Sequence, residues 1–543
     1  MKRERWAVAM ACSFVAWAGA PPAHAESPSE TTAVASREWG SYPILTFPEL
    51  PAVDVLLMDR QYDAPLGAGE SASVPSAAAI VNAVYDATGV RFRELPLTPE
   101  RVLAGLGRRP PAPRKTPARR WALRAGLGGL LAGLATFASI GLAIKPAMAP
   151  IQRPDPTTYS AATIEKGRRL AALGGCALCH TAKDGLLYAG GLALQTPFGI
   201  VMTTNITPDP ATGIGNWSFP AFERAMREGI HRDGRHLYPA FPYPNFATAT
   251  EADLQALYAF LMAQPAVVQA NKQSRLIFPF HIRPLLAVWN LLFNRQSEVQ
   301  TEPARSALWN RGRYLVDGLG HCGACHSPRN ALGAERSGSF YLSGGSAEGW
   351  DAPALTRVSM APVPWSEDEL FAYLRTGTAA HHGTASGPMA PVVEELKQLP
   401  DDDIRAMANY LASFNDALPG SEATTLAEHI TTSTAMATSS GSAARLYQGA
   451  CAVCHEPGAA LANRGPALGL SSKLYAANPT NFLRLLLEGG GHASGSMPGF
   501  AASLDDRQIT ELARYLRSRF APQQPQWRNV EQTLTTIRTV AAQ

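Results

Sequence analysis

Six of the seven cysteines in this 543-residue chain fall in three pairs, and a histidine follows each pair directly. The pairs are Cys176 with Cys179, Cys322 with Cys325, and Cys451 with Cys454, and the histidines are His180, His326 and His455. Cysteines at this spacing lie on one helical turn, where both thiols can reach the two vinyl groups of one porphyrin. The sequence therefore predicts three covalently bound haem c groups, each with a histidine as an axial ligand of the iron.

Two other kinds of site use closely spaced cysteines, namely zinc sites and thiol redox centres. Three copies that all end in histidine, each followed by the same apolar pattern, favour haem over both alternatives. The seventh cysteine, Cys12, stands in an apolar N-terminal stretch, and no cysteine outside the motifs is left to pair with it. We therefore expect no disulfide framework.

A common pattern of apolar residues and glycine follows the motifs, which indicates an internal repeat. After the first and second motifs the matching positions have identical spacings: Trp217, Phe222, Met226 and Gly229, then Trp365, Leu370, Leu374 and Gly377. The third repeat keeps Phe482, Leu486 and Gly489. Each repeat closes with an apolar stripe at helical spacing. We expect a mainly α-helical chain with three tandem class I-like cytochrome c domains near residues 160–265, 305–417 and 440–525.

An electron-carrying haem of this type is expected to have a methionine opposite the histidine, because a thioether ligand raises the reduction potential. The second repeat offers Met389 and the third offers Met497, each in a loop before the closing helix. A lone methionine more often fills core space than binds metal. The position after the motif and before the last helix favours the ligand role for both.

The first repeat has Phe241 at the matching place, and phenylalanine cannot ligate iron. The sixth ligand of the first haem is then His236, Met202 or His231, or this haem stays five-coordinate. We hypothesise that the first haem differs from the other two in ligation and in potential.

Two apolar segments precede the first repeat. Residues 1–25 combine a basic start, an apolar stretch and an Ala-x-Ala sequence, which is typical of a secretory signal. Residues 125–144 carry no charge and predict a transmembrane helix over 121–146. Five basic residues precede this run and one follows it, so the positive-inside rule places the cytochromes on the periplasmic side of a bacterial inner membrane. Cleavage of the leader would reverse that orientation, and we give the second segment more weight.

The region after the membrane segment resembles the triheme cytochrome subunits of membrane-bound bacterial alcohol, aldehyde and gluconate dehydrogenases. The resemblance rests on residues 204–209 (TNITPD), residues 235–240 (RHLYPA) and the three haem motifs. It implies a subunit that takes electrons from a catalytic partner and passes them to membrane quinone or to a terminal oxidase. The chain alone is not expected to be catalytic. The net charge of +4 gives no reason to expect nucleic acid as a partner.

Residues 37–106 resemble the C-terminus of a molybdenum hydroxylase subunit of the xanthine dehydrogenase family, in which a glutamate of a Gly-x-Gly-Glu motif is the active-site base. Glu70 matches that glutamate, and a plain structural role is the alternative for it. The resemblance implies a small α/β fragment here and molybdenum and iron–sulfur dehydrogenase subunits as partners. The whole arrangement resembles the C-terminal half of nicotinate dehydrogenase type fused subunits, with an aldehyde or an N-heterocycle as the partner's substrate.

Two alternative functions remain at this point. The chain could be the cytochrome subunit of a quinoprotein or flavoprotein alcohol or gluconate dehydrogenase, for which a methionine at position 241 would have argued. It could also be a haem-based sensor or peroxidase, for which only the uncertain sixth ligand of the first haem argues. Between the first two repeats, we expect the apolar residues 276–293 to pack mainly between domains, and a docking helix for the membrane or a partner is the alternative. Between the second and third repeats, we expect the Ser/Thr-rich residues 424–444 to form a flexible or partly ordered linker.

Overall fold

The computed structural model describes residues 76–93, 97–107, 145–294, 299–435, 440–456, 465–490 and 497–541. The chain divides into two units, residues 1–130 and 131–543. The described part of the first unit forms two helices, α2 (Ser76–Thr88) and α3 (Pro99–Gly105). Thr98 caps α3 by accepting the backbone N–H of Arg101. The described part of the 37–106 segment is helical and contains no strand, and the α/β fragment stays a prediction because residues 37–75 lie outside the described ranges.

Several predicted features lie outside the described residues. They are the leader at 1–25, Cys12, Glu70 and the apolar run at 125–144. Within the ranges that the structure describes, no helix is both long and apolar enough to cross a bilayer.

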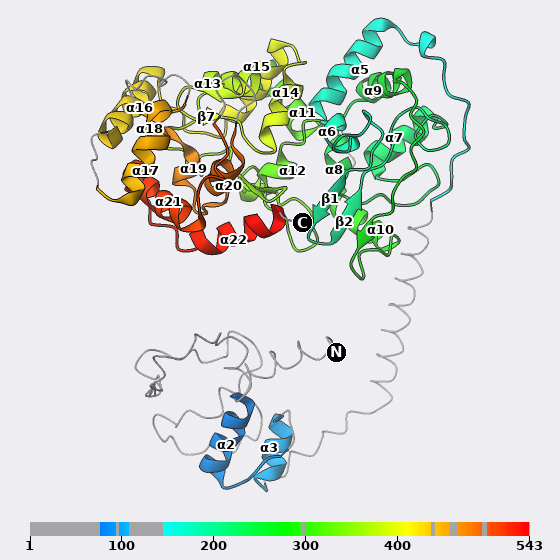
Figure 1. Cartoon of the computed structure of the whole chain (residues 1–543). Coiled ribbons are helices and arrows are strands. Elements are labelled where there is room, and N and C mark those ends of the chain that lie inside the picture. Colours follow the sequence, from blue (N-terminus) through cyan, green and yellow to red (C-terminus); the bar gives the residue numbers. More distant parts are fainter. Residues whose placement is uncertain are drawn as a thin grey trace. The chain divides into compact units, whose positions relative to one another are not determined.

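The second unit is mainly helical (Figure 1). Its first repeat starts with a short 3₁₀ turn and closes with α9, and a short strand and a further helix follow. The elements are η3 (Pro156–Thr158), α5 (Ala161–Leu173), α6 (Cys176–His180), β1 (Ala193–Thr196), β2 (Gly199–Met202), α7 (Phe219–Glu228), α8 (Tyr243–Phe246), α9 (Glu251–Ala263), β3 (Arg275–Leu276) and α10 (Leu285–Phe293). The three strands form one antiparallel sheet in the order β1-β2-β3.

The second repeat follows the same order, with two short hairpins in place of the sheet. Its elements are α11 (Ala307–Asp317), α12 (Gly323–His326), η4 (Gly338–Phe340), β4 (Gly345–Ala347), β5 (Trp350–Ala352), α13 (Glu367–Thr376), β6 (Thr378–Ala379), β7 (Gly383–Thr384), α14 (Met389–Leu396) and α15 (Asp401–Ala412). Gly229 and Gly377 end α7 and α13 with positive φ, so these repeated glycines are C-caps, where a side chain would be strained.

The third repeat has no strand among its described residues. Its elements are α17 (Ser442–Ala450), α18 (Ala452–His455), η6 (Leu468–Leu470), α19 (Ser472–Tyr475), α20 (Thr480–Glu488) and α21 (Asp506–Phe520). A further helix, α22 (Val530–Ala541), buries Val530, Leu534 and Ile537 in the core of this repeat. The compact region therefore continues past residue 525, where the apolar pattern of the repeat ends.

The Ser/Thr-rich segment is largely a helix, α16 (Gly420–Ala435). Its threonines satisfy their hydroxyls on carbonyls one turn back, as Thr424 does on Gly420 and Thr431 on Ala427. Ala423 and Ala427, four positions apart, are buried against Val363. Burial of this small apolar face stabilises a helix in a composition that is typical of a linker.

The first and last helices of the first two repeats cross in backbone contact at a glycine. A Cβ on Gly167 of α5 would lie 2.0 Å from the carbonyl oxygen of Ala256 in α9. A Cβ on Gly312 of α11 would lie 1.9 Å from the carbonyl oxygen of Ala406 in α15. Only glycine fits at either crossing without displacing the partner helix.

The first two repeats share a single hydrophobic core, whereas the third has its own. Between the first two, Tyr314 donates its hydroxyl to Asp253 at 2.6 Å, and Phe246 stacks on His321. Between the second and third, Asn481 exchanges two hydrogen bonds with the backbone of Asp351. Repeats one and two therefore form one packed pair, to which the third attaches through these hydrogen bonds and a small apolar cluster that joins Val363 to Leu470 through α16.

Replacing Gly167 with alanine should lower the free energy of unfolding by about 1–3 kcal/mol, because the added methyl group must separate α5 from α9. Gly449→Ala in α17 is the matched control, since nothing lies within 4 Å of its added Cβ, and it should be neutral or stabilising by up to about 1 kcal/mol. Denaturant unfolding followed by circular dichroism measures both. Equal stability of the two variants would contradict the close crossing.

Candidate haem sites

Each Cys-x-x-Cys-His motif forms one short turn of helix directly after the first helix of its repeat. In the first repeat Gly175 adopts a left-handed conformation and reverses the chain between α5 and α6. In the second and third repeats Cys322 and Cys451 occupy the N-cap position of α12 and α18. The helical turn places both cysteines and the histidine of each motif together, as the spacing predicted.

The histidine of each motif contacts a backbone carbonyl through its Nδ1 atom. The acceptors are the carbonyl oxygens of Thr204 for His180 at 2.6 Å, Pro353 for His326 at 2.7 Å and Pro466 for His455 at 2.9 Å. A ring that donates from Nδ1 keeps its proton there and leaves Nε2 as the free donor atom for a metal. This is the arrangement that an iron-ligating histidine requires.

Residues 204–209 form the loop that contains the carbonyl of Thr204, the acceptor for His180. The side-chain oxygen of Asn205 accepts the backbone N–H and hydroxyl of Thr207, while its amide donates to Val267 at 2.7 Å. Asp209 accepts the backbone N–H of Thr212 at 2.6 Å. These side chains fix the loop, so the motif positions the carbonyl of Thr204 and does not itself reach a haem.

The cysteines carry the chemistry expected of thioether attachment. None of the six is part of a disulfide bond, and each lies in the same helical turn as its histidine. Burial raises the pKa of Cys176 and of Cys322 to about 12. A thiol redox centre needs a low-pKa thiolate, so these two thiols do not match that alternative. Burial also lowers the pKa of His180 and His326, which favours the neutral imidazole that can bind iron.

The two predicted methionine ligands occupy matching places in their repeats. Met389 is the first residue of α14 and packs, partly buried, on the shared core. Met497 pairs with Gly490 across an isolated bridge and packs, partly buried, on the core of the third repeat. Both lie between the middle and closing helices, and their use as iron ligands remains a prediction.

Phe241 packs in the first repeat where a methionine is expected. Its ring lies 5.3 Å from the ring of Phe246 and contacts the shared core. The aromatic side chain is therefore accommodated by packing, and the repeat has an apolar group where the other two have a thioether.

Comparison with known families agrees with the motifs. A family model described as "Cytochrome c" matches residues 164–265 and 310–415, and one described as "Cytochrome C oxidase, cbb3-type, subunit III" matches residues 440–516. The cytochrome c subunit of the quinone alcohol dehydrogenase of Gluconacetobacter polyoxogenes is 35% identical over 412 residues, 72% of this chain and 86% of that protein. The gluconate 2-dehydrogenase cytochrome c subunit of Pantoea cypripedii is 36% identical, over 70% of this chain and 89% of that protein.

The chain belongs to the dehydrogenase cytochrome c subunits. A nicotinate dehydrogenase subunit of Pseudomonas putida is more similar, at 51% identity over 528 residues and 94% of this chain. The match covers 44% of that protein, so this chain spans less than half the length of that relative. The resemblance to cytochrome subunits and to nicotinate dehydrogenase type subunits is confirmed, and electron transfer through haem c is the function of the family.

Two of the residues predicted as sixth ligand of the first haem lie in different parts of the repeat. Met202 is the last residue of β2, two residues before Thr204, whose carbonyl contacts His180. His236 is buried, and its Nδ1 atom lies 3.4 Å from the amide nitrogen of Asn290. The use of either residue as an iron ligand remains a prediction.

His231, the third candidate, already has other contacts. Its Nδ1 atom lies 2.9 Å from a carboxylate oxygen of Asp233, and its ring meets Trp217 edge to face. Burial lowers its pKa to about 4. In the second repeat His382 lies flat on Trp365 at 3.5 Å, so contact between histidine and tryptophan recurs in the two repeats as a packing feature.

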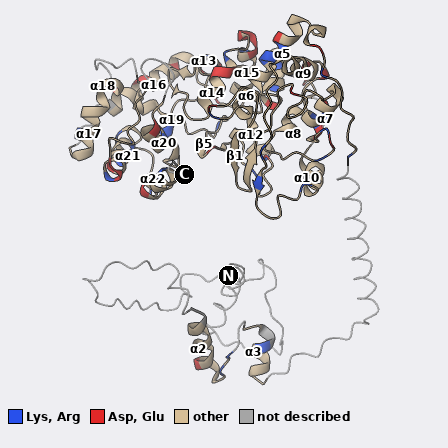
Figure 2. Ribbon diagram, turned by 45° about the vertical axis from the view of Figure 1, so that its right-hand side comes forward, with Lys and Arg blue, Asp and Glu red and all other residues tan. Residues whose placement is uncertain are grey.

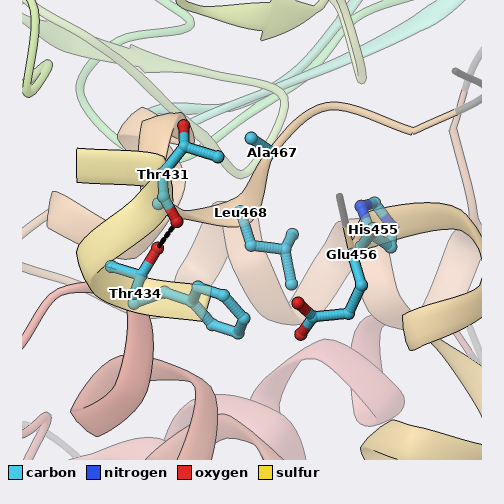
Figure 3. Close-up of a pocket in the computed structure, with 8 residues that line it drawn as sticks. Thr431, Thr434, His455, Glu456, Ala467 and Leu468 are labelled. Atoms are coloured by element: carbon cyan, nitrogen blue, oxygen red, sulfur yellow. Dashed lines mark hydrogen bonds between the residues drawn. The ribbon is translucent and has the colours of Figure 1, made fainter. Parts of the chain in front are cut away.

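The three carbonyl acceptors could not be found from residue types, because any residue can supply a backbone oxygen. They follow their histidines by 24, 27 and 11 residues. The third site is the one whose surroundings are drawn in Figure 3: His455 and Glu456 border a small pocket on one side, and Thr431 and Thr434 of α16 border it on the other. Helix α16 thus lies beside the third haem motif.

Replacing Met389 or Met497 with alanine should leave one haem without its distal sulfur in each variant. The reduced protein should then bind carbon monoxide at that haem, and its potential should fall because the thioether ligand is lost. Met262→Leu is the control, because this methionine is fully buried in the core and its replacement conserves volume. Carbon monoxide difference spectra and redox titration measure both effects. Unchanged spectra in both alanine variants would exclude these methionines as ligands.

Phe241→Met should convert the first haem to the ligation of the other two. We expect the potential of one haem to rise and the methionine-to-iron charge-transfer absorption of the oxidised protein to increase by about half. Phe246→Leu is the control, because it alters the neighbouring ring without supplying a thioether. A wild-type protein that already shows methionine ligation at every haem would contradict the hypothesis that the first haem differs.

Proposed function

We propose that this cytochrome holds three haem c groups and passes electrons from a molybdenum hydroxylase type dehydrogenase to quinone or a terminal oxidase. The observation that carries this proposal is the match to the nicotinate dehydrogenase subunit of Pseudomonas putida over 94% of the chain. The 6% of this chain that the match leaves out is shorter than the segment 37–106. The match therefore includes at least part of the segment that resembles a molybdenum hydroxylase. An aldehyde or an N-heterocycle is the proposed substrate of the partner.

Three sites with the same donor set support the haem count. Each would hold its porphyrin through two thioethers and one imidazole: Cys176, Cys179 and His180; Cys322, Cys325 and His326; Cys451, Cys454 and His455. The histidine Nδ1 contacts to Thr204, Pro353 and Pro466 orient the three rings. When bound, the haem irons supply one-electron redox chemistry, while the protein orients the rings and sets their potentials.

Contacts between the repeats support electron transfer from haem to haem. A Cβ on Gly174, two residues before Cys176, would lie 3.7 Å from the carbonyl of Leu319, three residues before Cys322. A Cβ on Gly383 would lie 3.6 Å from Pro466, whose carbonyl accepts from His455. The segments that lead into the first two haem motifs thus meet at the first junction. At the second junction β7 meets the residue whose carbonyl contacts His455, which supports a path through the second repeat between the other two.

A location at the bacterial inner membrane, with the haems on the periplasmic side, completes the proposal. It is supported by the uncharged run at 125–144 and by the five basic residues before it. The cytochrome would be anchored there next to its quinone or oxidase acceptor. The segment around Glu70 would contact or complete the partner's molybdenum subunit.

A second candidate partner is a quinoprotein or flavoprotein dehydrogenase. The 35–36% identity to cytochrome subunits of alcohol and gluconate dehydrogenases favours it. Phe241 and the 51% identity to the nicotinate dehydrogenase protein favour the molybdenum type. A haem sensor or peroxidase function is supported only by the lack of a methionine at position 241, which leaves the sixth ligand of the first haem open.

Affinity purification of the tagged cytochrome from its own host, in mild detergent, should recover a partner that contains molybdenum and iron–sulfur clusters. Metal analysis and visible spectra of the complex measure this directly. Deletion of residues 37–106 should reduce the recovered molybdenum, while the haem content per chain stays constant. Recovery of a flavin or quinone-cofactor protein would favour the second candidate, and recovery of the cytochrome alone would contradict both.

A further inference from the structure

A run of large apolar side chains between the first two repeats is exposed, although interdomain packing was the expected use of this segment. The exposed residues are Ile277, Phe278, Ile282, Leu285, Val288, Leu291 and Leu292, and we call them the 277–292 surface. Phe278 is 77% exposed and Leu291 is 73% exposed. An apolar patch of this size on a folded unit marks an interaction site.

The opposite side of the same segment is fixed to the protein. Ala287 is buried, Trp289 donates its indole N–H to the carbonyl of Leu332 at 2.9 Å, and Asn290 donates to the carbonyl of Glu228 at 2.9 Å. β3 also pairs with β2, and the backbone N–H of Ile277 donates to the carbonyl of Phe198. The 277–292 surface is therefore held by secondary structure and side-chain contacts on its inner side.

The charged side chains within this stretch of the sequence have one sign, although the carboxylate of Asp233 lies near Arg283. No Asp or Glu occurs between Asp253 and Glu298, whereas Lys272 and Arg275 precede the surface and are exposed. Figure 2 shows α10 without Lys, Arg, Asp or Glu. An apolar helix face with basic neighbours, and with tryptophan beside it, is the composition of segments that lie in the headgroup region of anionic bilayers.

The path of the chain places this surface near the end of the predicted membrane segment, which ends at Ile144. Lys145 follows, and its carbonyl lies 2.0 Å from where a Cβ of Gly234 would be. Two residues further on, the carbonyl of His236 accepts from Arg283 at 2.7 Å. Gly234, which meets Lys145, and His236, which meets Arg283, are two residues apart and so separated by at most about 7 Å along the chain. Arg283 lies between Ile282 and Leu285 of the surface, so the surface starts close to where the chain leaves the apolar run.

From these observations we infer that the 277–292 surface binds the anionic lipid surface of the membrane in which the preceding apolar run is anchored. This inference rests on the membrane location in the proposed function. The surface is a second, interfacial contact that holds the first repeat against the bilayer, with Leu291 and Leu292 in the apolar layer and Lys272 and Arg275 at the headgroups. Figure 1 shows α10 at the edge of the group of repeats.

The test cuts the membrane anchor away after the full chain has folded. A recognition sequence for a specific protease is inserted between Ile144 and Lys145, and the haem-loaded chain is reconstituted into vesicles that contain phosphatidylglycerol. After cleavage, flotation of the vesicles is followed by haem absorption. The released unit should stay on the vesicles, and the double variant Leu291→Ser with Leu292→Ser should lower its bound fraction by about tenfold or more.

The matched control is Leu186→Ser with Leu187→Ser, because these two leucines are 61% and 56% exposed in the same repeat but outside the 277–292 surface. Its binding should equal that of wild type, and haem absorption and circular dichroism confirm that all variants are folded. Release of the cleaved wild-type unit while the uncut chain floats would overturn this inference alone and point to a protein as the occupant. Equal binding of the two double variants would also overturn it. Failure of the uncut chain to float would overturn the membrane location as well.

Discussion

The crossing of the first and last helices controls the position of the haem motif in the first two repeats. Gly167 meets Ala256 and Gly312 meets Ala406 at backbone distance, so neither pair of helices can slide without a clash. The motif begins only a few residues after the first helix ends, as Cys176 does after Leu173. Because the connection is short, the position of the helix crossing determines where the cysteines lie, and thus where they would hold the edge of the porphyrin. Packing of two helices therefore sets the place where the redox chemistry occurs.

The orientation of each haem-motif histidine is fixed by a loop, and these loops differ in length among the three repeats. The carbonyl acceptor follows its histidine by 24 residues in the first repeat, by 27 in the second and by 11 in the third. The β1–β2 hairpin precedes the acceptor in the first repeat, and the β4–β5 hairpin precedes it in the second. Since only a backbone oxygen is needed, loop length and side chains are free to vary. The repeats can diverge in their surfaces and partners while the three rings keep one ligand geometry.

Features with a fixed residue type were predictable from the sequence. Haem attachment requires cysteine and histidine, so the spacing predicted the motifs. The same alignment found Gly229 and Gly377 as repeated positions, and the structure shows that they are helix caps, which require glycine. Features that depend on burial were not predictable from residue type. Helix α16 forms because Ala423 and Ala427 are buried against Val363. Helix α22 packs because Trp527 and Val530 are buried in the core of the third repeat. The carbonyl acceptors leave no trace in residue type. The sixth ligand of the first haem remains a prediction from residue chemistry, because Met202, His236 and His231 each offer a donor atom.

The first repeat differs from the others in the exposed face of α10 and in the loop that contains Phe241, and Asn290 contacts the surroundings of both. Asn290, on the inner side of α10, donates to the carbonyl of Glu228 at the end of α7 and accepts the hydroxyl of Tyr243 at the start of α8. The loop that contains Phe241 lies between these two points. By contrast, the helix after the second repeat, α16, turns Ala423 inward and leaves no comparable apolar surface exposed among its described residues. The exposed face of α10 and the loop without methionine are therefore held by the same hydrogen bonds. A displacement of α10 on binding would therefore also displace the loop that contains Phe241.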